Sequence, residues 1–282
     1  MREISHSLFL HNNETLSYEF FDYHVLYHNP TIYEVFRVIN RTPLFLKAHL
    51  DRLFTSVQAG NLHMNTTYNQ LLDMIMRLID MNDIGDMNMK VIVQFEQEVE
   101  TDIYVYFNVS RYPTVYEYQH GVKLRLYEAV RENPAIKFVR QKLRENTIAY
   151  MKESDAFETL LVDTDGNITE GSRTNVFFVK DSALYTAPSD TVLLGITRQA
   201  TIELAKRRGF QLFEQCIRKA EISDFDSVFI TGTSPMLLPV SHIEGISYKV
   251  DNLVMRTLMN DYLQMVNNNL SVFSFAKLHA SV

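Results

Sequence analysis

The stretch LLVDTDGNITEGSRTNVFFVKDSALYTAP, residues 160–188, decides most of the fold. It contains two pairs of apolar runs, and a short polar turn joins the members of each pair; Asp165-Gly166 in the first pair is a typical hairpin turn. The stretch therefore predicts two successive β-hairpins. LLGITRQATIELAKRRGF follows at residues 193–210 and predicts a helix that begins after Gly195 and ends at Gly209, behind three basic residues.

Strands and helices also alternate on either side of that stretch. Residues 16–27 and 32–40 are rich in aromatic and apolar side chains and predict strands. Residues 48–60 predict a helix with a glycine at its end, and a second helix follows with Asn65 or Thr66 as its N-cap. Further strands are predicted at residues 89–96, 102–110, 121–130, 227–233 and 248–250, and further helices at 138–154 and from Asp251.

A polar, proline-containing segment, RENPAI, lies near the middle of the chain at residues 131–136. Such a composition is typical of an interdomain linker. We therefore predict an N-terminal α/β domain over residues 1–127, a linker over 128–136 and a C-terminal domain over 137–282. Because hairpins and helices occur in both halves, the pattern favours a two-domain α+β fold over a doubly wound parallel sheet.

Composition limits the classes of function. The 282 residues carry 27 Lys and Arg against 34 Asp and Glu, and the net charge of -7 disfavours binding to nucleic acid. The N-terminus lacks a secretory signal, and no window offers the roughly 20 apolar residues of a membrane helix, so we expect a cytoplasmic protein without membrane contact. One cysteine, Cys216, and a histidine pair, His24 and His28, without an obvious acidic third ligand predict no metal site.

Several short segments hold polar residues in patterns that suit chemistry. Each has a structural explanation when it is taken alone, as a surface helix residue, a charge at a strand end or a turn glycine. Two of the segments, residues 195–198 and 231–234, are turns of a kind that can bind an anion. The segments are residues 49–53, 136–137, 167–172, 195–198 and 231–234.

Taken together, these segments resemble the class IV aminotransferase family, the fold-type-IV pyridoxal-phosphate enzymes. This family includes branched-chain aminotransferases, D-amino-acid aminotransferases and aminodeoxychorismate lyases. The resemblance runs from about Tyr33 to about Val250, and YEVFRVINRTPLFLKAHLDRL (33–53) and the stretch at 160–206 carry it. It implies an N-terminal α/β sandwich, a C-terminal pseudo-barrel with helices, a pyridoxal 5′-phosphate cofactor, small-molecule substrates and a homodimer.

The resemblance also implies which residues act on the cofactor ring. Lys137 would form the Schiff base with the cofactor. Glu170 would keep the pyridine nitrogen protonated, so that the ring accepts electrons from the substrate Cα. Two rival lysines, Lys142 and Lys152, lie on the predicted helix at the wrong distance from Glu170.

The phosphate group would have separate partners under the same resemblance. The Arg52 guanidinium offers two N–H groups to it. The backbone N–H groups of Ile196 and Thr197 would bind it at a helix N-terminus, and Thr233 would complete the site. The residues expected near the substrate are Tyr33, Arg140 and Ser234.

The sequence departs from the family's pattern beside these residues. Arg140 stands where the family commonly has an asparagine after the lysine, and Pro235 and Met236 stand where small residues and an acid are frequent. These departures leave the cofactor roles unchanged and affect the identity of the substrate. Arg140 and Arg173 are the basic residues that we expect nearest to the substrate.

The resulting prediction is an aminotransferase that moves an amino group from an L-amino acid, branched-chain or otherwise apolar, to a 2-oxo acid such as 2-oxoglutarate. Two alternatives stay open: an aminodeoxychorismate lyase that releases pyruvate and 4-aminobenzoate, and a catalytically idle cofactor-binding protein. The lyases typically place a threonine near the positions of Glu34 and Val35, which have no hydroxyl group. The lack of an Arg/His pair in MKVIVQFE (89–96) disfavours a D-amino-acid substrate.

Overall fold

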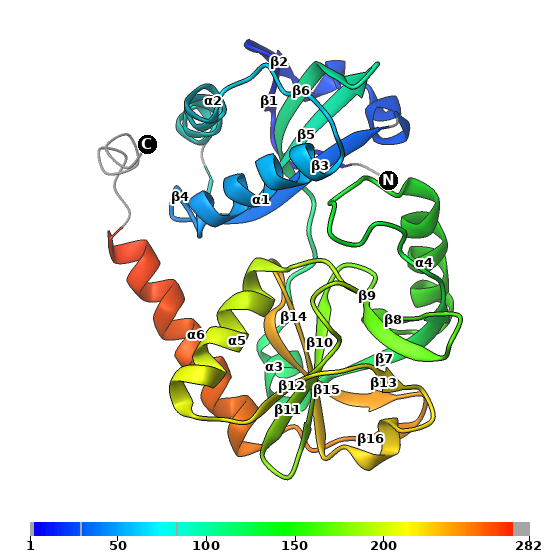
Figure 1. Cartoon of the computed structure of the whole chain (residues 1–282). Coiled ribbons are helices and arrows are strands. Elements are labelled where there is room, and N and C mark those ends of the chain that lie inside the picture. The colour runs from blue at the N-terminus through cyan, green and yellow to red at the C-terminus, as the bar shows by residue number, and fades with distance from the viewer. Residues whose placement is uncertain (1–2, 29, 83, 273–282) are drawn as a thin grey trace. The chain divides into compact units, whose positions relative to one another are not determined.

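The computed structural model describes residues 3–28, 30–82 and 84–272 (Figure 1). Contacts between Cα atoms divide the chain into two units. Unit 1 comprises the described residues up to Arg111, Ile136–Gln141 and those from Val266, and unit 2 comprises Tyr112–Ala135 and Lys142–Met265. The domains expected at residues 1–127 and 137–282 stay a prediction.

Unit 1 contains a six-stranded sheet in the order β2-β1-β6-β5-β3-β4, and every neighbouring pair is antiparallel. Side chains along β3 alternate, so that Glu34, Phe36 and Val38 are buried while the residues between them are half-buried. The strands are β1 (Leu8–His11), β2 (Glu14–Ser17), β3 (Thr31–Ile39), β4 (Thr42–Pro43), β5 (Asp86–Glu96) and β6 (Val99–Asn108).

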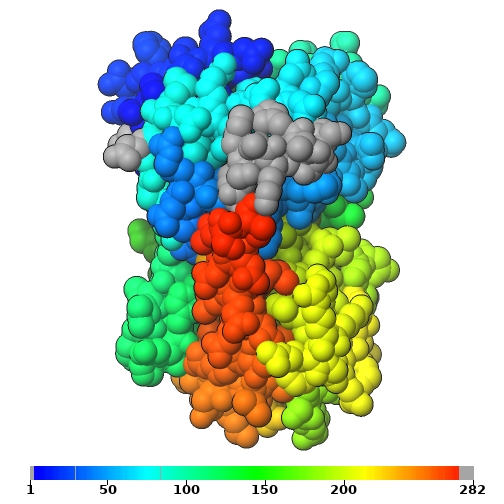
Figure 2. Space-filling model, turned by 90° about the vertical axis from the view of Figure 1, so that its left-hand side faces the viewer, coloured from blue at the N-terminus to red at the C-terminus, as the bar shows by residue number. Residues whose placement is uncertain are grey.

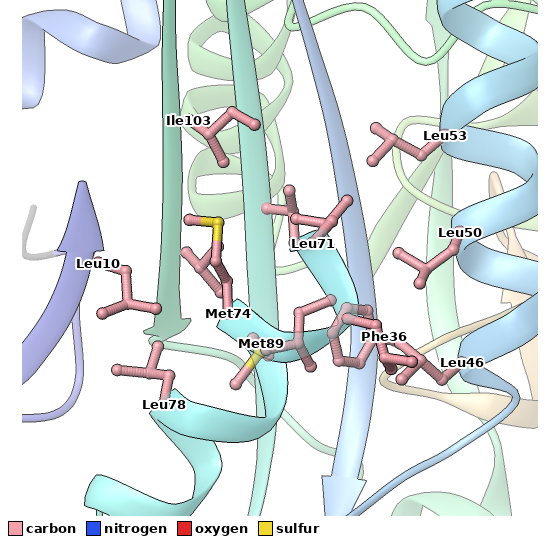
Figure 3. Close-up of a cluster of buried hydrophobic side chains, with 14 of the residues drawn as sticks. Leu10, Phe36, Leu46, Leu50, Leu53, Leu71, Met74, Leu78, Met89 and Ile103 are labelled. Carbon is pink, nitrogen blue, oxygen red and sulfur yellow. The ribbon is translucent and has the colours of Figure 1, made fainter. Parts of the chain in front are cut away.

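Two helices, α1 (Leu46–Ala59) and α2 (Tyr68–Met81), cover one face of this sheet. Their apolar side chains recur at helical spacing and point toward the strands (Figure 3). Each large side chain that is fully buried in this way contributes roughly 1.5–3 kcal/mol to folding. The labelled members of this core are Leu10, Phe36, Leu46, Leu50, Leu53, Leu71, Met74, Leu78, Met89 and Ile103.

The ends of these helices follow local capping chemistry. α1 ends at the predicted Gly60, whose N–H donates to the Ser56 carbonyl. The N-cap of α2 is Thr67 and not Asn65 or Thr66 as predicted. The Thr67 hydroxyl accepts from the Gln70 backbone, and the Gln70 side chain accepts from the Thr67 N–H, which forms a reciprocal capping box.

The other face of the sheet is covered by a segment that we predicted wrongly as one strand, residues 16–27. Two 3-10 helices, Tyr18–Phe20 and Tyr23–Tyr27, replace most of it, because the Asp22 carboxylate accepts from the His24 N–H and turns the chain. Phe21, Val25 and Leu26 from this segment pack on Ile92 and Tyr106 of the sheet.

Unit 2 contains a ten-stranded sheet that curls into a half-barrel (Figure 1). Both predicted hairpins are present, since β8 pairs with β9 and β10 pairs with β11, and Gly166 adopts a φ of 80° in the first turn. The last predicted strand, 248–250, is instead Ile246–Ser247. The strands are β7 (Val122–Glu128), β8 (Glu158–Val162), β9 (Asn167–Gly171), β10 (Asn175–Lys180), β11 (Ala183–Thr186), β12 (Leu212–Glu214), β13 (Ile217–Arg218), β14 (Ser227–Gly232), β15 (Met236–Ile243) and β16 (Ile246–Ser247).

Helix α4 (Gln141–Glu153) begins three residues later than we predicted. The residues before it are extended and pair with the start of β3: the Val139 N–H donates to the Thr31 carbonyl, and the Tyr33 N–H donates to the Lys137 carbonyl. Lys137 therefore lies on an added edge of the unit 1 sheet and not on a helix.

The remaining helices of unit 2 are α3 (Val115–His120), α5 (Ile196–Arg208) and the part of α6 (Leu253–Val272) that precedes Val266. α5 begins and ends where we predicted, with Gly195 and Gly209 as its caps. α6 lies on the surface beside α5 (Figure 2), and an Arg208–Asp261 ion pair joins the two helices. None of the described helices is long and apolar enough to cross a membrane.

Candidate active site

Lys137 is held by its backbone and by an aromatic ring in unit 1. Its carbonyl accepts from the Tyr33 N–H at 3.1 Å, and its own N–H donates to the Ser56 hydroxyl at 3.4 Å. Its ammonium group lies 4.8 Å from the centre of the Tyr33 ring, a distance typical of a cation–π contact. Two predicted site residues, Tyr33 and Lys137, are therefore neighbours.

Arg52 is oriented by a carboxylate on the opposite face of β3 from Tyr33. Glu34 is fully buried, and it accepts from the Arg52 Nε at 2.9 Å and from the Arg52 Nη2. His49, one turn earlier on α1, places its Nδ1 3.0 Å from the same carboxylate. A carboxylate only accepts hydrogen bonds, so His49 carries a proton on Nδ1.

These contacts set the charges around Lys137. Burial raises the pKa of Glu34, but Arg52, His49 and Lys137 outweigh burial and hold that pKa well below its ordinary value. Burial lowers the pKa of His49 below 6.5, and Arg52 and Lys137 add to the effect although Glu34 opposes it. At neutral pH, Glu34 is therefore an anion and His49 is neutral.

Glu170 is the matching carboxylate of unit 2, near the end of β9. It is buried, and its Oε1 lies 2.8 Å from the Arg131 Nε. Its Oε2 accepts from the Leu193 N–H at 3.2 Å and from the Asn175 side-chain amide at 3.3 Å. Positive charge and hydrogen-bond donors both favour the ionised form of a buried carboxylate.

Asn175 connects Glu170 to the loop that precedes α5. Its amide nitrogen also donates to the Leu193 carbonyl at 2.9 Å. Its amide oxygen lies so close to Gly195 that a Cβ at position 195 would be 2.2 Å away from it. Glycine is therefore favoured at this position by a close approach and not by its φ, which is -61°.

The N-terminus of α5 has no side-chain cap. Its N-cap, Gly195, makes no side-chain hydrogen bond, and so the first N–H groups of this 13-residue helix are without a side-chain cap. Thr197, in the first turn, is buried and its hydroxyl lies 3.4 Å from the Tyr262 hydroxyl. The turn between β14 and β15 contains Thr233 and Ser234, both half-buried.

The predicted site residues thus form two sets. Tyr33, Arg52 and Lys137 lie in unit 1 together with Arg140, which precedes α4 in the same extended segment. Glu170, Ile196, Thr197, Thr233 and Ser234 lie in unit 2. The rival lysines Lys142 and Lys152 both lie on α4.

Sequence reasoning missed several partners of these residues. Asn175 and Arg131 contact Glu170. Glu34 contacts both Arg52 and His49. The sequence did contain a signal for Asn175. This amide stands at the start of the apolar run NVFFV, and a buried amide side chain needs hydrogen-bond partners. The sequence offered no such signal for Arg131, because we placed this residue in the predicted interdomain linker.

Comparisons with known proteins find similar sequences and a similar fold. The family model described as Amino-transferase class IV matches residues 31–243. A protein of Rickettsia conorii named "Probable branched-chain-amino-acid aminotransferase" is 28% identical over 90% of this chain and 94% of its own length. The D-alanine aminotransferase of Bacillus licheniformis is 27% identical over 76% of this chain and 79% of its own length.

A solved structure has the same fold. It is the branched-chain amino acid aminotransferase of Escherichia coli, with a TM-score of 0.81 and 20% sequence identity. The match covers 92% of this chain and 94% of that one. The expected two-part architecture of sandwich and pseudo-barrel is confirmed by this likeness.

The buried histidine predicts a loss of stability in mild acid. The pKa of His49 is lowered in the folded chain, so below its ordinary value of 6.5 the unfolded chain binds a proton that the folded chain does not. The free energy of unfolding should fall as pH drops below that value, by at most about 1.4 kcal/mol per pH unit for this group. In urea titrations His49→Asn should flatten this slope, whereas His63→Asn, at an exposed position, should leave it unchanged.

The contact between Gly195 and Asn175 predicts a coupled pair of substitutions. Gly195→Ala should lower the free energy of unfolding by about 1–3 kcal/mol, because the new methyl group overlaps the Asn175 oxygen. Gly85→Ala is the control, since a Cβ there meets nothing within 4 Å. In a double-mutant cycle with Asn175→Ala, the two effects should be less than additive. Strict additivity would contradict the close approach.

Proposed function

Because the chain belongs to the class IV aminotransferase family, we propose that it moves an amino group from an L-amino acid with a branched or otherwise apolar side chain to a 2-oxo acid such as 2-oxoglutarate. The family that we expected from the motifs is confirmed by the match over residues 31–243. The observation that carries the proposal is Glu170, a buried carboxylate whose two oxygens are paired with Arg131, Asn175 and the Leu193 N–H.

Class IV aminotransferases use pyridoxal 5′-phosphate, and the chemistry of the residues fits this cofactor. A buried carboxylate such as Glu170 suits a protonated ring nitrogen. The start of α5, without a side-chain cap, suits a phosphate dianion, and Thr197 and Thr233 add hydroxyl groups in unit 2. Arg52, oriented by Glu34, supplies a cation with fixed direction.

Each residue then has a defined task in the proposed reaction. Bound pyridoxal phosphate supplies an electron sink for the pair left when the substrate Cα loses its proton. The Lys137 amine would hold the cofactor until the amine of the substrate displaces it. Once free, it would take that proton as a base and return it as an acid to the carbonyl carbon of the cofactor, two atoms from the substrate Cα. Glu170 keeps the proton on the ring nitrogen, and Arg52 and the N–H groups of Ile196 and Thr197 hold the phosphate in place.

The branched-chain substrate is supported by the names of the relatives and by the aromatic surroundings of Lys137. The ring of Tyr33 lies beside its ammonium group, and an apolar side chain would pack on that ring. We assign the substrate carboxylate to Ser234 and Arg140. We also propose that the protein is cytoplasmic and that it forms a homodimer, and the resemblance of the motifs implies the homodimer.

The first test identifies the lysine. Borohydride reduction of the yellow holoenzyme should leave a pyridoxyl mass on the peptide that contains Lys137. Lys137→Ala should retain the cofactor through its phosphate partners and lose turnover by several orders of magnitude. Lys142→Ala and Lys152→Ala, on α4, are the controls. Both variants should still carry the pyridoxyl label on Lys137 and should remain active. A label on Lys142 or Lys152 in the unaltered protein would refute the assignment.

The second test identifies the reaction. An apolar L-amino acid alone should convert the bound cofactor stoichiometrically to its amine form, and 2-oxoglutarate should then restore the original absorption band. D-amino acids should be inactive. Release of 4-aminobenzoate from aminodeoxychorismate without amino transfer would replace this proposal with the lyase, and no reaction with either class would indicate a cofactor-binding protein without turnover.

A further inference from the structure

Helix α6 presents a buried tyrosine to the start of α5. Tyr262 has 5% of its surface exposed, and its hydroxyl lies 3.4 Å from the hydroxyl of Thr197. Thr197 is equally buried, and it is the second residue of α5. A phenylalanine would fill the same space, whereas a buried phenol needs a polar partner. The hydroxyl at position 262 therefore calls for an explanation besides packing.

The contact is held in place by the way α6 is seated on unit 2. Met255 and Leu258, which precede Tyr262 by seven and four residues, are fully buried. Side chains at these spacings share one face of a helix, so this face of α6 lies against protein. The ion pair between Asp261 and Arg208 of α5 adds an anchor beside Tyr262. The position of the Tyr262 hydroxyl is consequently set by the whole helix.

The two hydroxyl groups in this contact differ in acidity. A phenol loses its proton at a pH of about 10, whereas an aliphatic hydroxyl keeps its proton throughout the pH range of folded proteins. The phenol is therefore the stronger hydrogen-bond donor, and the aliphatic hydroxyl is the stronger acceptor. This difference favours Tyr262 as the donor to Thr197. Thr197 then retains its own proton for another acceptor, because each hydroxyl has one proton and two lone pairs.

The side chain of Thr197 leans toward the beginning of its helix. In an α-helix the Cα–Cβ bonds tilt toward the N-terminus, and at this end the first N–H groups of α5 have no side-chain cap. An anion bound to these N–H groups is thus a ready acceptor for the Thr197 proton. A hydroxyl that accepts one hydrogen bond is polarised by it and donates the next one more strongly.

We propose that Tyr262 is a positioning residue for the cofactor phosphate: its hydroxyl donates to Thr197 and thereby directs the Thr197 proton toward the phosphate. The inference rests on the proposed function, which puts that phosphate at the start of α5. Tyr262 acts through Thr197 and needs no contact with the cofactor. The proposal gives a role to α6, a helix that carries none of the residues indicated by the motifs.

The test compares pyridoxal 5′-phosphate with pyridoxal, which has the same ring and aldehyde and lacks the phosphate. The ratio of their dissociation constants for the whole chain therefore measures the contribution of the phosphate. Tyr262→Phe keeps the aromatic ring and removes the hydroxyl. It should weaken the binding of pyridoxal 5′-phosphate about three- to tenfold, the effect of one hydrogen bond, and leave the binding of pyridoxal unchanged. A purely structural role of Tyr262 would weaken both compounds alike.

Two further variants make the comparison specific. Tyr248→Phe is the matched control, because Tyr248 is also a buried tyrosine of unit 2 and its hydroxyl donates to the Ile222 carbonyl at 3.0 Å. This variant should leave the ratio of the two dissociation constants unchanged. Thr197→Val removes the hydroxyl through which Tyr262 acts. Adding Tyr262→Phe to Thr197→Val should then cause no further loss of affinity for pyridoxal 5′-phosphate.

The inference is refuted if Tyr262→Phe leaves both dissociation constants unchanged or raises both by the same factor. It is also refuted if the effects of Tyr262→Phe and Thr197→Val add in full. Because binding requires no turnover, the outcome for the proposed function is read separately. Amino transfer with an unchanged ratio would keep the proposed function and reject the role of Tyr262. A selective loss of phosphate affinity in a chain without amino transfer would support Tyr262 and reject the aminotransferase reaction.

Discussion

The buried carboxylate of Glu34 constrains unit 1 more than any other group. A carboxylate removed from water is tolerated only when cations and hydrogen-bond donors surround it. Arg52 and His49 meet this requirement from one face of α1, so the helix can have only one rotation about its axis relative to β3. That rotation also directs Leu46, Leu50 and Leu53 into the core, and the apolar and the ionic requirements of α1 therefore agree.

The same rule organises unit 2 around Glu170. Its partners come from three places in the sequence: Arg131 before α4, Asn175 at the start of β10, and the Leu193 N–H before α5. Because Asn175 also contacts the backbone at Gly195, the position of the carboxylate and the start of α5 are fixed together. The group proposed for the ring nitrogen and the group proposed for the phosphate thus share one neighbour, Asn175.

These partners mark the limit of what the sequence predicts. The hairpins, the caps of α5 and the end of α1 follow from local spacing, and all were predicted correctly. The 3-10 helices at residues 18–27 and the extended segment around Lys137 depend on Asp22 and on pairing with β3, which local patterns do not contain. Likewise, motifs indicated Lys137, Arg52 and Glu170, but Arg131 and Tyr262 reach their partners only through the folded chain.

The alternation of β3 explains why these chemistries do not interfere. Successive side chains point to opposite faces, so Tyr33 faces Lys137 and Lys90 while Glu34 faces Arg52 and His49. Glu34 therefore keeps Arg52 in place without lying on the Tyr33 face, where its charge would repel an anionic substrate. A slip of one residue in the pairing with β5 would exchange the two faces, burying Tyr33 and Val35 against α1 and exposing the carboxylate to Lys90. The register of this one strand is consequently a functional property as well as a structural one.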